Sequence, residues 1–235
     1  MFAEKIIYKR DGETTEVGLA ICYNKDVPTA NEWLSQQEMM RCRTLSGKRK
    51  GSYLSGRWAA KNAILKYLSS SSFSDIDITT GVFGQPVVEG VKHCCISISH
   101  TETMAAAIAF PEKHLMGVDV EQLEDVSNAA KFIDFQNHEH LLIQRLGVPN
   151  GPAILWSSKE AVGKAMRTGL TLPLETFAVN SVLEIKSGYL VLFKNILQFK
   201  CLNFVMGSYV VSIALPEKSD LILPFDNLKS FITGV

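Results

Sequence analysis

The chain has 235 residues, of which 24 are basic, 24 are acidic and 46% are hydrophobic. This length and hydrophobic content provide for a sizeable core, in one large domain or two small ones. The zero net charge excludes a general attraction to nucleic acid or to membranes, so an anion-binding site has to be a local cluster of charges. Residues 1–10 lack the apolar run of a signal peptide, and no apolar run is long enough to span a membrane, so we expect a cytoplasmic protein.

The five cysteines show neither a disulfide framework nor metal-ligand spacing. The adjacent Cys94 and Cys95 point to opposite faces of any strand that contains them. We therefore expect all five to be reduced and mostly buried thiols, as is usual in the cytoplasm.

The apolar pattern predicts long helices beside runs of strands. The first helical region is expected to break at 46–51, because two glycines and the run Lys48-Arg49-Lys50 disfavour a continuous helix. In chain order we predict a strand at 17–23, helix at 31–68 with that break, a loop at 69–74, strands at 75–80, 86–89, 94–99, 103–110 and 116–121, a mostly helical segment at 126–146, a long helix from about Pro152 to Gly169, and strands at 176–185, 189–194, 198–206 and 208–215.

An internal repeat is visible in this order. Ile108-Ala-Phe-Pro-Glu-Lys recurs as Ile213-Ala-Leu-Pro-Glu-Lys at an offset of 105, and residues 55–59 parallel 157–161 at an offset of 102. The repeat predicts an α+β fold in which a unit of one helix and an antiparallel sheet is duplicated about a pseudo-two-fold axis. We place the two halves at residues 1–112 and 113–235 and expect ligands in a cleft between them.

The long helix carries an unusual group of charges. Glu160 lies between Lys159 and Lys164, and Glu160 and Lys164 are one helical turn apart. One interpretation is a solvated ion pair worth about 0.2–0.5 kcal/mol. The other interpretation is a functional cluster. The polar and charged segments that precede this helix in the sequence favour it.

Asp119 and Glu121 alternate with Val118 and Val120, so on a strand the two carboxylates share one face and the valines face the core. The simple interpretation is a polar face in water. Two carboxylates side by side also suit a hard cation, because Mg²⁺ prefers one or two carboxylates together with phosphate oxygens and water.

A second cluster is basic. Arg57 and Lys61 are one turn apart on a predicted helix, where like charges are mildly destabilising and an anion would relieve them. A solvated basic face is the alternative. Ser97 and Ser99 share one face of a later strand, and His100 stands at its end, where it is either structural or a donor to phosphate.

Together these segments resemble the Sfp-type 4′-phosphopantetheinyl transferases over roughly residues 35–180. The Gly-Val-Asp-Val-Glu and Trp-Ser-Ser-Lys-Glu-Ala segments, about 40 residues apart, carry the strongest signal. The matching segments are Ser55-Gly56-Arg57 with Ala60 and Lys61, Phe83-Gly84-Gln85-Pro86, Ile96-Ser97-Ile98-Ser99-His100, Gly117-Val118-Asp119-Val120-Glu121, Glu139, Trp156-Ser157-Ser158-Lys159-Glu160-Ala161 with Lys164, and Gly169-Leu170-Thr171-Leu172-Pro173-Leu174.

The resemblance implies a fold of two similar halves and an Mg²⁺-dependent reaction. A serine of an acyl or peptidyl carrier protein attacks coenzyme A (CoA), phosphopantetheine is transferred, and adenosine 3′,5′-bisphosphate leaves. By position, the metal ligands would be Asp119, Glu121 and Glu160; the catalytic residues Glu160, as general base, and Lys164; and the CoA-binding residues Arg57, Lys61, Ser99, His100, Lys159 and Lys164. We expect a monomer without nucleic-acid or membrane partners.

One departure from the family pattern is Gln85, where the family often has lysine, so one charge toward CoA is missing. Lys61 or the run Lys48-Arg49-Lys50 is a possible replacement. Two further interpretations are a CoA- or nucleotide-binding module without catalysis and a scaffold that binds carrier proteins. A non-catalytic module would be expected to lose a carboxylate, and none is lost here.

Overall fold

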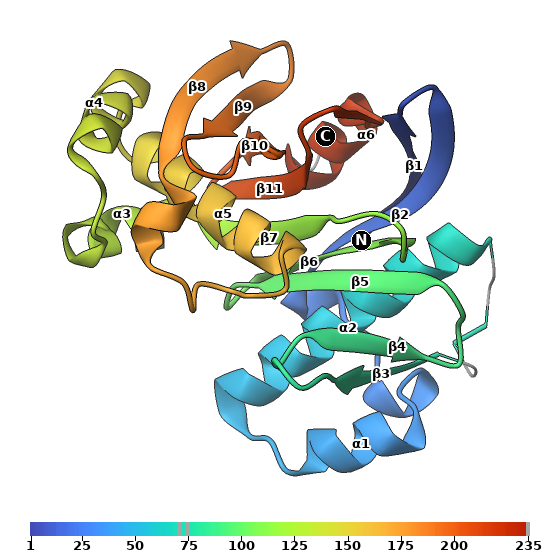
Figure 1. The fold of residues 1–235 in the computed structure, drawn as a ribbon. Helices are drawn as coiled ribbons and strands as arrows, with labels where there is room; N and C mark the ends of the chain where they lie inside the picture. The colour runs from blue at the N-terminus through green and yellow to red at the C-terminus, as the bar shows by residue number, and fades with distance from the viewer. Residues whose placement is uncertain (70–71, 74–75, 234–235) are drawn as a thin grey trace. The chain divides into compact units, whose positions relative to one another are not determined.

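The computed structural model describes residues 1–69, 72–73 and 76–233 (Figure 1). They form two compact units. The first contains Met1–His114 together with Asp220–Phe231, and the second contains Leu115–Ser219. Of the predicted segments, parts of the loop at 69–74 and the first residue of the strand at 75–80 lie outside the described residues.

The first unit contains a five-stranded sheet in the order β12-β1-β2-β6-β5 and a two-stranded sheet, β3-β4. The pairs β1-β2, β2-β6, β5-β6 and β3-β4 are antiparallel. Its elements are β1 (Phe2–Arg10), β2 (Glu13–Tyr23), 3₁₀ turns at Asn24–Asp26 and Ala30–Glu32, α1 (Gln36–Arg43), α2 (Gly47–Leu68), β3 (Asp77–Thr80), β4 (Pro86–Glu89), β5 (Cys94–His100), β6 (Met104–Pro111), β12 (Ser219–Ile222) and most of α6 (Phe225–Thr233).

The second unit contains a five-stranded antiparallel sheet in the order β7-β11-β10-β9-β8, covered by α5. Its elements are β7 (Gly117–Gln122), α3 (Leu123–Ala129), a 3₁₀ turn at Ala130–Phe132, α4 (Asn137–Leu146), α5 (Asn150–Ala165), a 3₁₀ turn at Leu174–Phe177, β8 (Val179–Ile185), β9 (Gly188–Phe193), β10 (Phe199–Met206) and β11 (Tyr209–Pro216).

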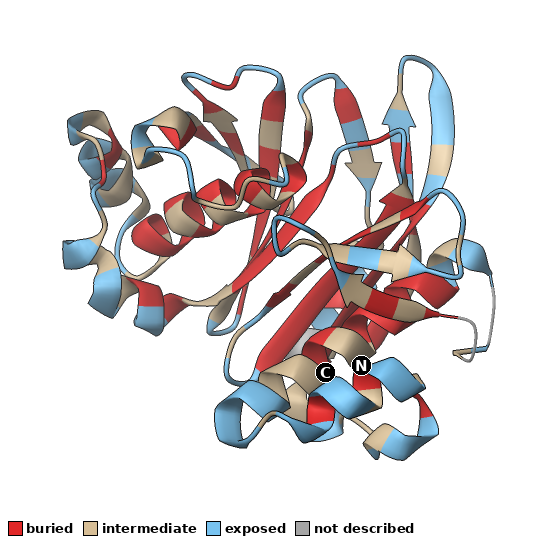
Figure 2. Ribbon diagram, turned by 60° about the horizontal axis from the view of Figure 1, so that its bottom comes forward, coloured by how far each residue is buried: buried red, intermediate tan, exposed pale blue. Residues whose placement is uncertain are grey.

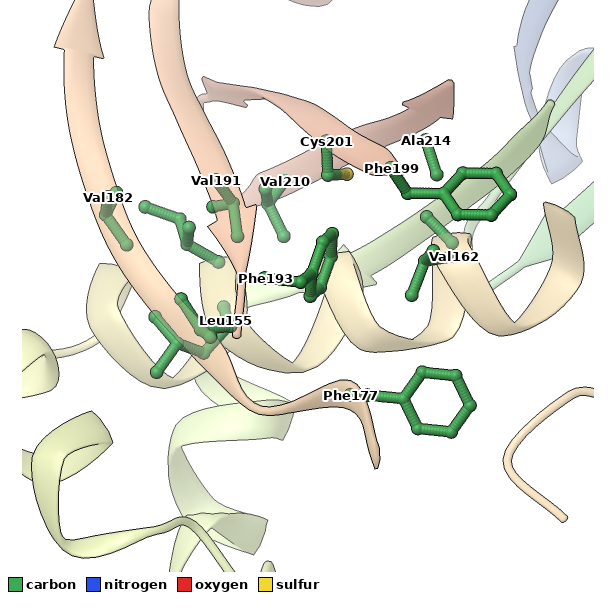
Figure 3. Close-up of a cluster of buried hydrophobic side chains, with 14 of the residues drawn as sticks. Leu155, Val162, Phe177, Val182, Val191, Phe193, Phe199, Cys201, Val210 and Ala214 are labelled. Carbon is green, nitrogen blue, oxygen red and sulfur yellow. The ribbon is translucent and has the colours of Figure 1, made fainter. Parts of the chain in front are cut away.

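The core of the second unit lies between α5 and its sheet. Leu155 and Val162 project from α5 into the same buried cluster as Phe193, Phe199 and Val210 (Figure 3). Each fully buried side chain of this size contributes roughly 1.5–3 kcal/mol. The strand next to β7 is buried from Val210 to Leu215, as β6 is from Met104 to Phe110 in the first unit (Figure 2).

The α+β fold with antiparallel sheets was predicted correctly, and several boundaries differ. The break between α1 and α2 falls at 44–46, and the basic run at 48–50 lies in the first turns of α2. The prediction missed β1, β12 and α6. It also placed the whole of 113–235 in one half, whereas Asp220–Phe231 returns to the first unit, because β12 extends the sheet beside β1. No helix among the described residues is both long and apolar enough to cross a membrane.

In each unit one glycine lets the main helix approach a strand of the sheet. A Cβ atom on Gly18 of β2 would lie 1.9 Å from the carbonyl oxygen of Ala63, and one on Gly117 of β7 would lie 2.1 Å from that of Ala161. Both distances are far below van der Waals contact, so a residue with a side chain would push the helix away. The two glycines therefore identify equivalent points in the two units.

This equivalence confirms the strand part of the repeat and corrects the helix part. Gly18 pairs with Ala109 and Gly117 with Ala214, which preserves the predicted offset of 105. On the helices, however, Ala63 matches Ala161, an offset of 98 instead of 102. The predicted helix alignment is therefore wrong by one turn, since a shift of four residues keeps the same helix face and leaves the sequence pattern similar.

Replacement of Gly117 by alanine is expected to destabilise the protein by about 1–3 kcal/mol, because the new methyl group overpacks the contact between α5 and β7. Urea denaturation followed by circular dichroism measures the loss. Gly51 of α2 is the matched control, since a Cβ there meets nothing within 4 Å. Gly51→Ala should stabilise by about 0.5–1 kcal/mol through helix propensity. Equal stability of Gly117→Ala and wild type would contradict the close approach.

Candidate active site

The second unit gathers polar side chains on the face of β7 that α5 covers. Gly117, Asp119 and Glu121 alternate along the strand and therefore share one face, on which Gly117 touches α5. Val118 and Val120 point the other way and are buried. The carboxylate face is thus covered by a helix instead of lying in water, which removes the simple interpretation of this pattern.

Asp119 is almost completely buried and is held by two residues of α5. Ser157 Oγ donates a hydrogen bond to Oδ2 at 2.8 Å, and Lys164 Nζ forms an ion pair with Oδ1 at 2.6 Å. Asp119 is only 2% exposed, while the Lys164 side chain is 25% exposed and reaches the surface. A buried carboxylate requires such charge-assisted partners, because an isolated buried charge is very unfavourable.

Glu121 and Glu160 lie close enough to Asp119 and Lys164 for these charges to shift the pKa values of both glutamates. Trp156 Nε1 donates to Glu121 Oε1 at 3.1 Å. Burial and the nearby Asp119 raise the pKa of Glu121 to about 8. Burial also raises the pKa of Glu160, with Lys164 acting against the shift and Asp119 adding to it. Two carboxyl groups with raised pKa values, Glu121 and Glu160, beside Asp119 and Lys164 are an arrangement typical of functional sites.

These carboxylates do not form a closed coordination shell. Within residues 1–69, 72–73 and 76–233, no group of three or more His, Cys, Asp or Glu side chains is arranged to hold a metal ion. One oxygen of Asp119 is engaged by Lys164 and the other by Ser157. The residues still suit Mg²⁺, because this ion takes one or two carboxylates and completes its shell with water and substrate phosphates.

Lys159 does not lie in this cluster. Its side chain is completely buried and contacts both carboxylate oxygens of Glu139, at 2.7 and 2.9 Å. Burial lowers the pKa of Lys159, and the hydrogen bond to Glu139 acts in the opposite direction. Glu139 also accepts from the backbone N–H groups of Gln136 and Val179. The structure thus gives Lys159 a buried partner instead of the predicted contact with CoA, because the ammonium group is enclosed and paired with Glu139.

Lys61 is enclosed in the same way in the first unit. It is completely buried and pairs with Glu38 at 2.8 Å, while its Nζ also donates to the backbone oxygen of Trp33. Glu38 caps α1 as Glu139 caps α4, each as the third residue of its helix. The structure thus gives Lys61 buried partners instead of the predicted contact with phosphate. Its offset of 98 from Lys159 agrees with the helix alignment given by the glycines.

The other predicted residues of the first unit lie on the middle of α2 and at the end of β5. Arg57 is 15% exposed, with its guanidinium 5.0 Å from the centre of the Tyr53 ring and Nε 3.6 Å from Glu38 Oε1. His100 is exposed at the end of β5, and its ring lies close to Gly56. Ser99 is buried on the opposite face of the strand from Ile98. Arg57 and His100 thus remain accessible candidates for anion contacts.

Sequence reasoning missed the donors that orient the carboxylates. Trp156 and Ser157 belong to the segment that was singled out, yet no role was assigned to them. The signal available in the sequence was spacing. Trp156, Ser157, Glu160 and Lys164 lie within about two turns of the predicted helix, and Trp156, Glu160 and Lys164 follow one another at intervals of four residues. Only the contact with β7 shows which of them reach Asp119 and Glu121.

Comparison with the sequences of known proteins assigns the chain to a family. Residues 115–214 match the model of the 4′-phosphopantetheinyl transferase superfamily. A holo-[acyl-carrier-protein] synthase of Mycoplasma mycoides subsp. mycoides SC is 36% identical over 103 residues, which cover 41% of this chain and 93% of the relative. One of Streptococcus thermophilus is 36% identical over 101 residues, covering 39% of this chain and 83% of the relative.

Among solved structures, a holo-(acyl-carrier-protein) synthase from Bacillus anthracis in complex with CoA (3′,5′-ADP) aligns with a TM-score of 0.37 and 23% identity, over 44% of this chain and 95% of the other. The sequence matches nearly span the Mycoplasma relative and establish the family. The chain belongs to the 4′-phosphopantetheinyl transferase superfamily, and the family resemblance predicted from the motifs is confirmed.

Replacement of Lys61 by methionine is expected to destabilise the protein by about 3–5 kcal/mol, because it removes the buried ammonium group that pairs with the buried Glu38 carboxylate. Urea denaturation gives the free energy of unfolding. The control is Lys113→Met, which breaks an exposed pair with Glu13 at 3.1 Å and should cost less than about 1 kcal/mol. If both substitutions cost equally little, the Lys61–Glu38 pair is not a buried structural contact.

Proposed function

We propose that the chain transfers the 4′-phosphopantetheine group from coenzyme A to a serine of an apo acyl or peptidyl carrier protein and releases adenosine 3′,5′-bisphosphate. The observation that carries the proposal is the Asp119–Lys164 pair beside Glu121 and Glu160, within the segment that matches the family model. We also propose a cytoplasmic location and an acyl or peptidyl carrier protein as the protein substrate.

In the proposed reaction the serine hydroxyl oxygen forms a bond to the β-phosphorus of CoA, and the bond from that phosphorus to the bridging oxygen of adenosine bisphosphate breaks. Glu160 accepts the hydroxyl proton. Its raised pKa suits this role, because a general base works best with a pKa near the working pH. The adenosine bisphosphate departs with the bridging oxygen, so atoms and charge balance.

Lys164 stabilises the reacting phosphoryl group in this proposal. Its Nζ is held at Asp119 and its side chain reaches the surface, so that a phosphate oxygen approaching the pair meets a fixed positive charge. Phosphoryl transfer depends mainly on such positioning and on neutralisation of charge at the phosphate oxygens. Asp119 fixes Lys164, and Ser157 fixes Asp119.

Mg²⁺ fits this site. The raised pKa of Glu121 reports repulsion from Asp119 in addition to burial, and a divalent cation would relieve that repulsion. We propose that Asp119, Glu121 and Glu160 hold the ion, directly or through water. When bound, the ion supplies charge neutralisation for the phosphate oxygens.

On the first unit we propose that Arg57, Ser99 and His100 contribute to CoA binding. Arg57 is the strongest candidate, because neither its Nε nor the neighbouring Glu38 Oε1 has a hydrogen-bond partner among the described residues. Because Lys61 is enclosed, its charge cannot replace the charge that is missing at Gln85.

For the carrier protein we propose the segment 126–150 as part of the docking surface. Among the apolar side chains of this segment, Phe132 and Leu141 are 82% and 66% exposed, whereas Phe135 is buried and Leu142 packs on the core. The Lys131 ammonium lies 5.0 Å from the centre of the Phe132 ring. An exposed aromatic ring with a cation suits a partner that is acidic around its modified serine.

Asp119→Asn is expected to lower the rate of transfer at least about a hundredfold, because the amide is neutral and no longer holds Lys164 and Mg²⁺ in place. Intact mass spectrometry of an apo carrier protein after incubation with CoA and Mg²⁺ follows the added phosphopantetheine. The control is Glu13→Gln, which removes a 73%-exposed carboxylate and should leave the rate unchanged. Wild-type turnover by a folded Asp119→Asn protein would remove Asp119 from the site.

Phe132→Ser and Leu141→Ser are expected to raise the KM for the carrier protein about tenfold each and to leave the KM for CoA unchanged, because exposed apolar anchors contribute strongly to docking. The matched control is Leu197→Ser, an apolar residue of the second unit that is 71% exposed and lies outside the segment. An unchanged KM for the carrier in both variants would place the docking surface elsewhere.

A further inference from the structure

A buried polar network lies directly beside Asp119. Asn203 Oδ1 of β10 accepts hydrogen bonds from Ser158 Oγ of α5 at 2.9 Å and from Ser212 Oγ of β11 at 2.5 Å. Asn203 Nδ2 donates to the backbone oxygen of Cys201 at 3.3 Å. All three side chains are 0% exposed. The network therefore joins α5 to β10 and β11 by hydrogen bonds, in addition to the apolar packing between the helix and the sheet.

The network borders the candidate site both on the helix and on the sheet. Ser158 follows Ser157, which donates to Asp119. Ser212 is the cross-strand partner of Asp119, and Asn203 is the cross-strand partner of Ser212. Cross-strand partners point to the same face of a sheet, so the side chains at 119, 212 and 203 form one polar row across three neighbouring strands.

The first unit provides an internal comparison, because the same positions there are apolar. With Gly18 matched to Gly117, the row of Asp119, Ser212 and Asn203 corresponds to Ala20, Ala107 and Ile98. With Ala63 matched to Ala161, Ser157 and Ser158 correspond to Ala59 and Ala60. These five apolar residues pack together between α2 and its sheet. The packing of helix on sheet thus does not need polar groups at these places.

Buried hydroxyl and amide groups contribute little net stability even when paired, since folding only exchanges water for protein partners. Their presence only in the unit that holds the carboxylates therefore calls for another explanation. We infer that Ser158, Asn203 and Ser212 are positioning residues that fix α5 on the sheet so that Ser157 and Lys164 meet Asp119. This inference rests on the proposed transfer function.

The test installs the residues of the first unit in the second, as Ser158→Ala/Asn203→Ile/Ser212→Ala. Replacing the hydrogen-bonded side chains of a buried network together by apolar groups is often neutral or stabilising, so the free energy of unfolding should be unchanged or higher. The kcat for phosphopantetheine transfer should fall about ten- to hundredfold, because a small displacement of α5 misplaces Lys164. The KM values for CoA and for the carrier protein should stay within about twofold.

A second readout uses the protein alone, without CoA or metal. Amide hydrogen exchange of residues 157–164 should accelerate about tenfold in the triple variant while its global stability is retained, because local opening no longer breaks the network. A merely structural role would instead lower global stability and leave kcat per folded molecule unchanged. Wild-type kcat and wild-type exchange in a folded triple variant would overturn the inference.

The control is Ser55→Ala, which removes a completely buried serine of α2 whose hydroxyl donates to the carbonyl oxygens of Gly51 and Ser52 within the same helix. Its kcat should equal that of the wild type. Absence of transfer by the wild type would refute the proposed function and is thereby distinguished from failure of the network. If the triple variant does not fold, Ser158→Ala and Ser212→Ala each leave Asn203 Oδ1 one donor, and wild-type kcat in both would overturn the inference.

Discussion

Helix α5 lies against strand β7 at a distance that only glycine permits. The Cβ atom that Gly117 lacks would overlap the carbonyl oxygen of Ala161. This close approach brings side chains of the helix within hydrogen-bonding distance of the strand's carboxylates, so Ser157 and Lys164 reach Asp119 directly. A wider separation would admit water, and the electrostatic coupling among these groups would weaken with the higher local dielectric constant. The candidate site therefore depends on one missing side chain.

The same packing occurs in the first unit, where Gly18 contacts α2, but the chemistry is absent. Alanine stands at positions 20 and 59, where the second unit has Asp119 and Ser157. The buried ion pair is nevertheless kept in both units, as Lys61 with Glu38 and Lys159 with Glu139. The buried ion pair that recurs in both units therefore stabilises the fold. The polar row of Asp119, Ser212 and Asn203 occurs only in the unit that carries the carboxylates.

Basic residues of the same helix differ in role according to the helix face on which they lie. Lys159 and Lys164 are five residues apart on α5 and thus point in clearly different directions. Lys159 is enclosed against α4 by Glu139, and Lys164 extends past Asp119 to the surface. The same holds for Lys61 and Arg57 on α2, of which only Arg57 retains some exposure. Charge alone does not distinguish a phosphate ligand from a structural partner.

The sequence by itself determined the fold class, the strand part of the repeat and the family. Alternation along 118–121 placed both carboxylates on one face, and the two motifs flanking residues 122–155 identified the transferase superfamily. These features are local, because they depend only on periodicities of two and 3.6 residues and on spacing along the chain.

Only the tertiary structure decided which charged side chains are accessible to a ligand. It enclosed Lys61 and Lys159, shifted the helix alignment by one turn, added β12 to the first unit and joined Ser158 to Asn203 and Ser212. Each of these results depends on partners at least nine residues away in the sequence, and periodicity carries no information about such partners. Burial of a charge is a property of the surrounding elements, so no pattern within one helix reveals it.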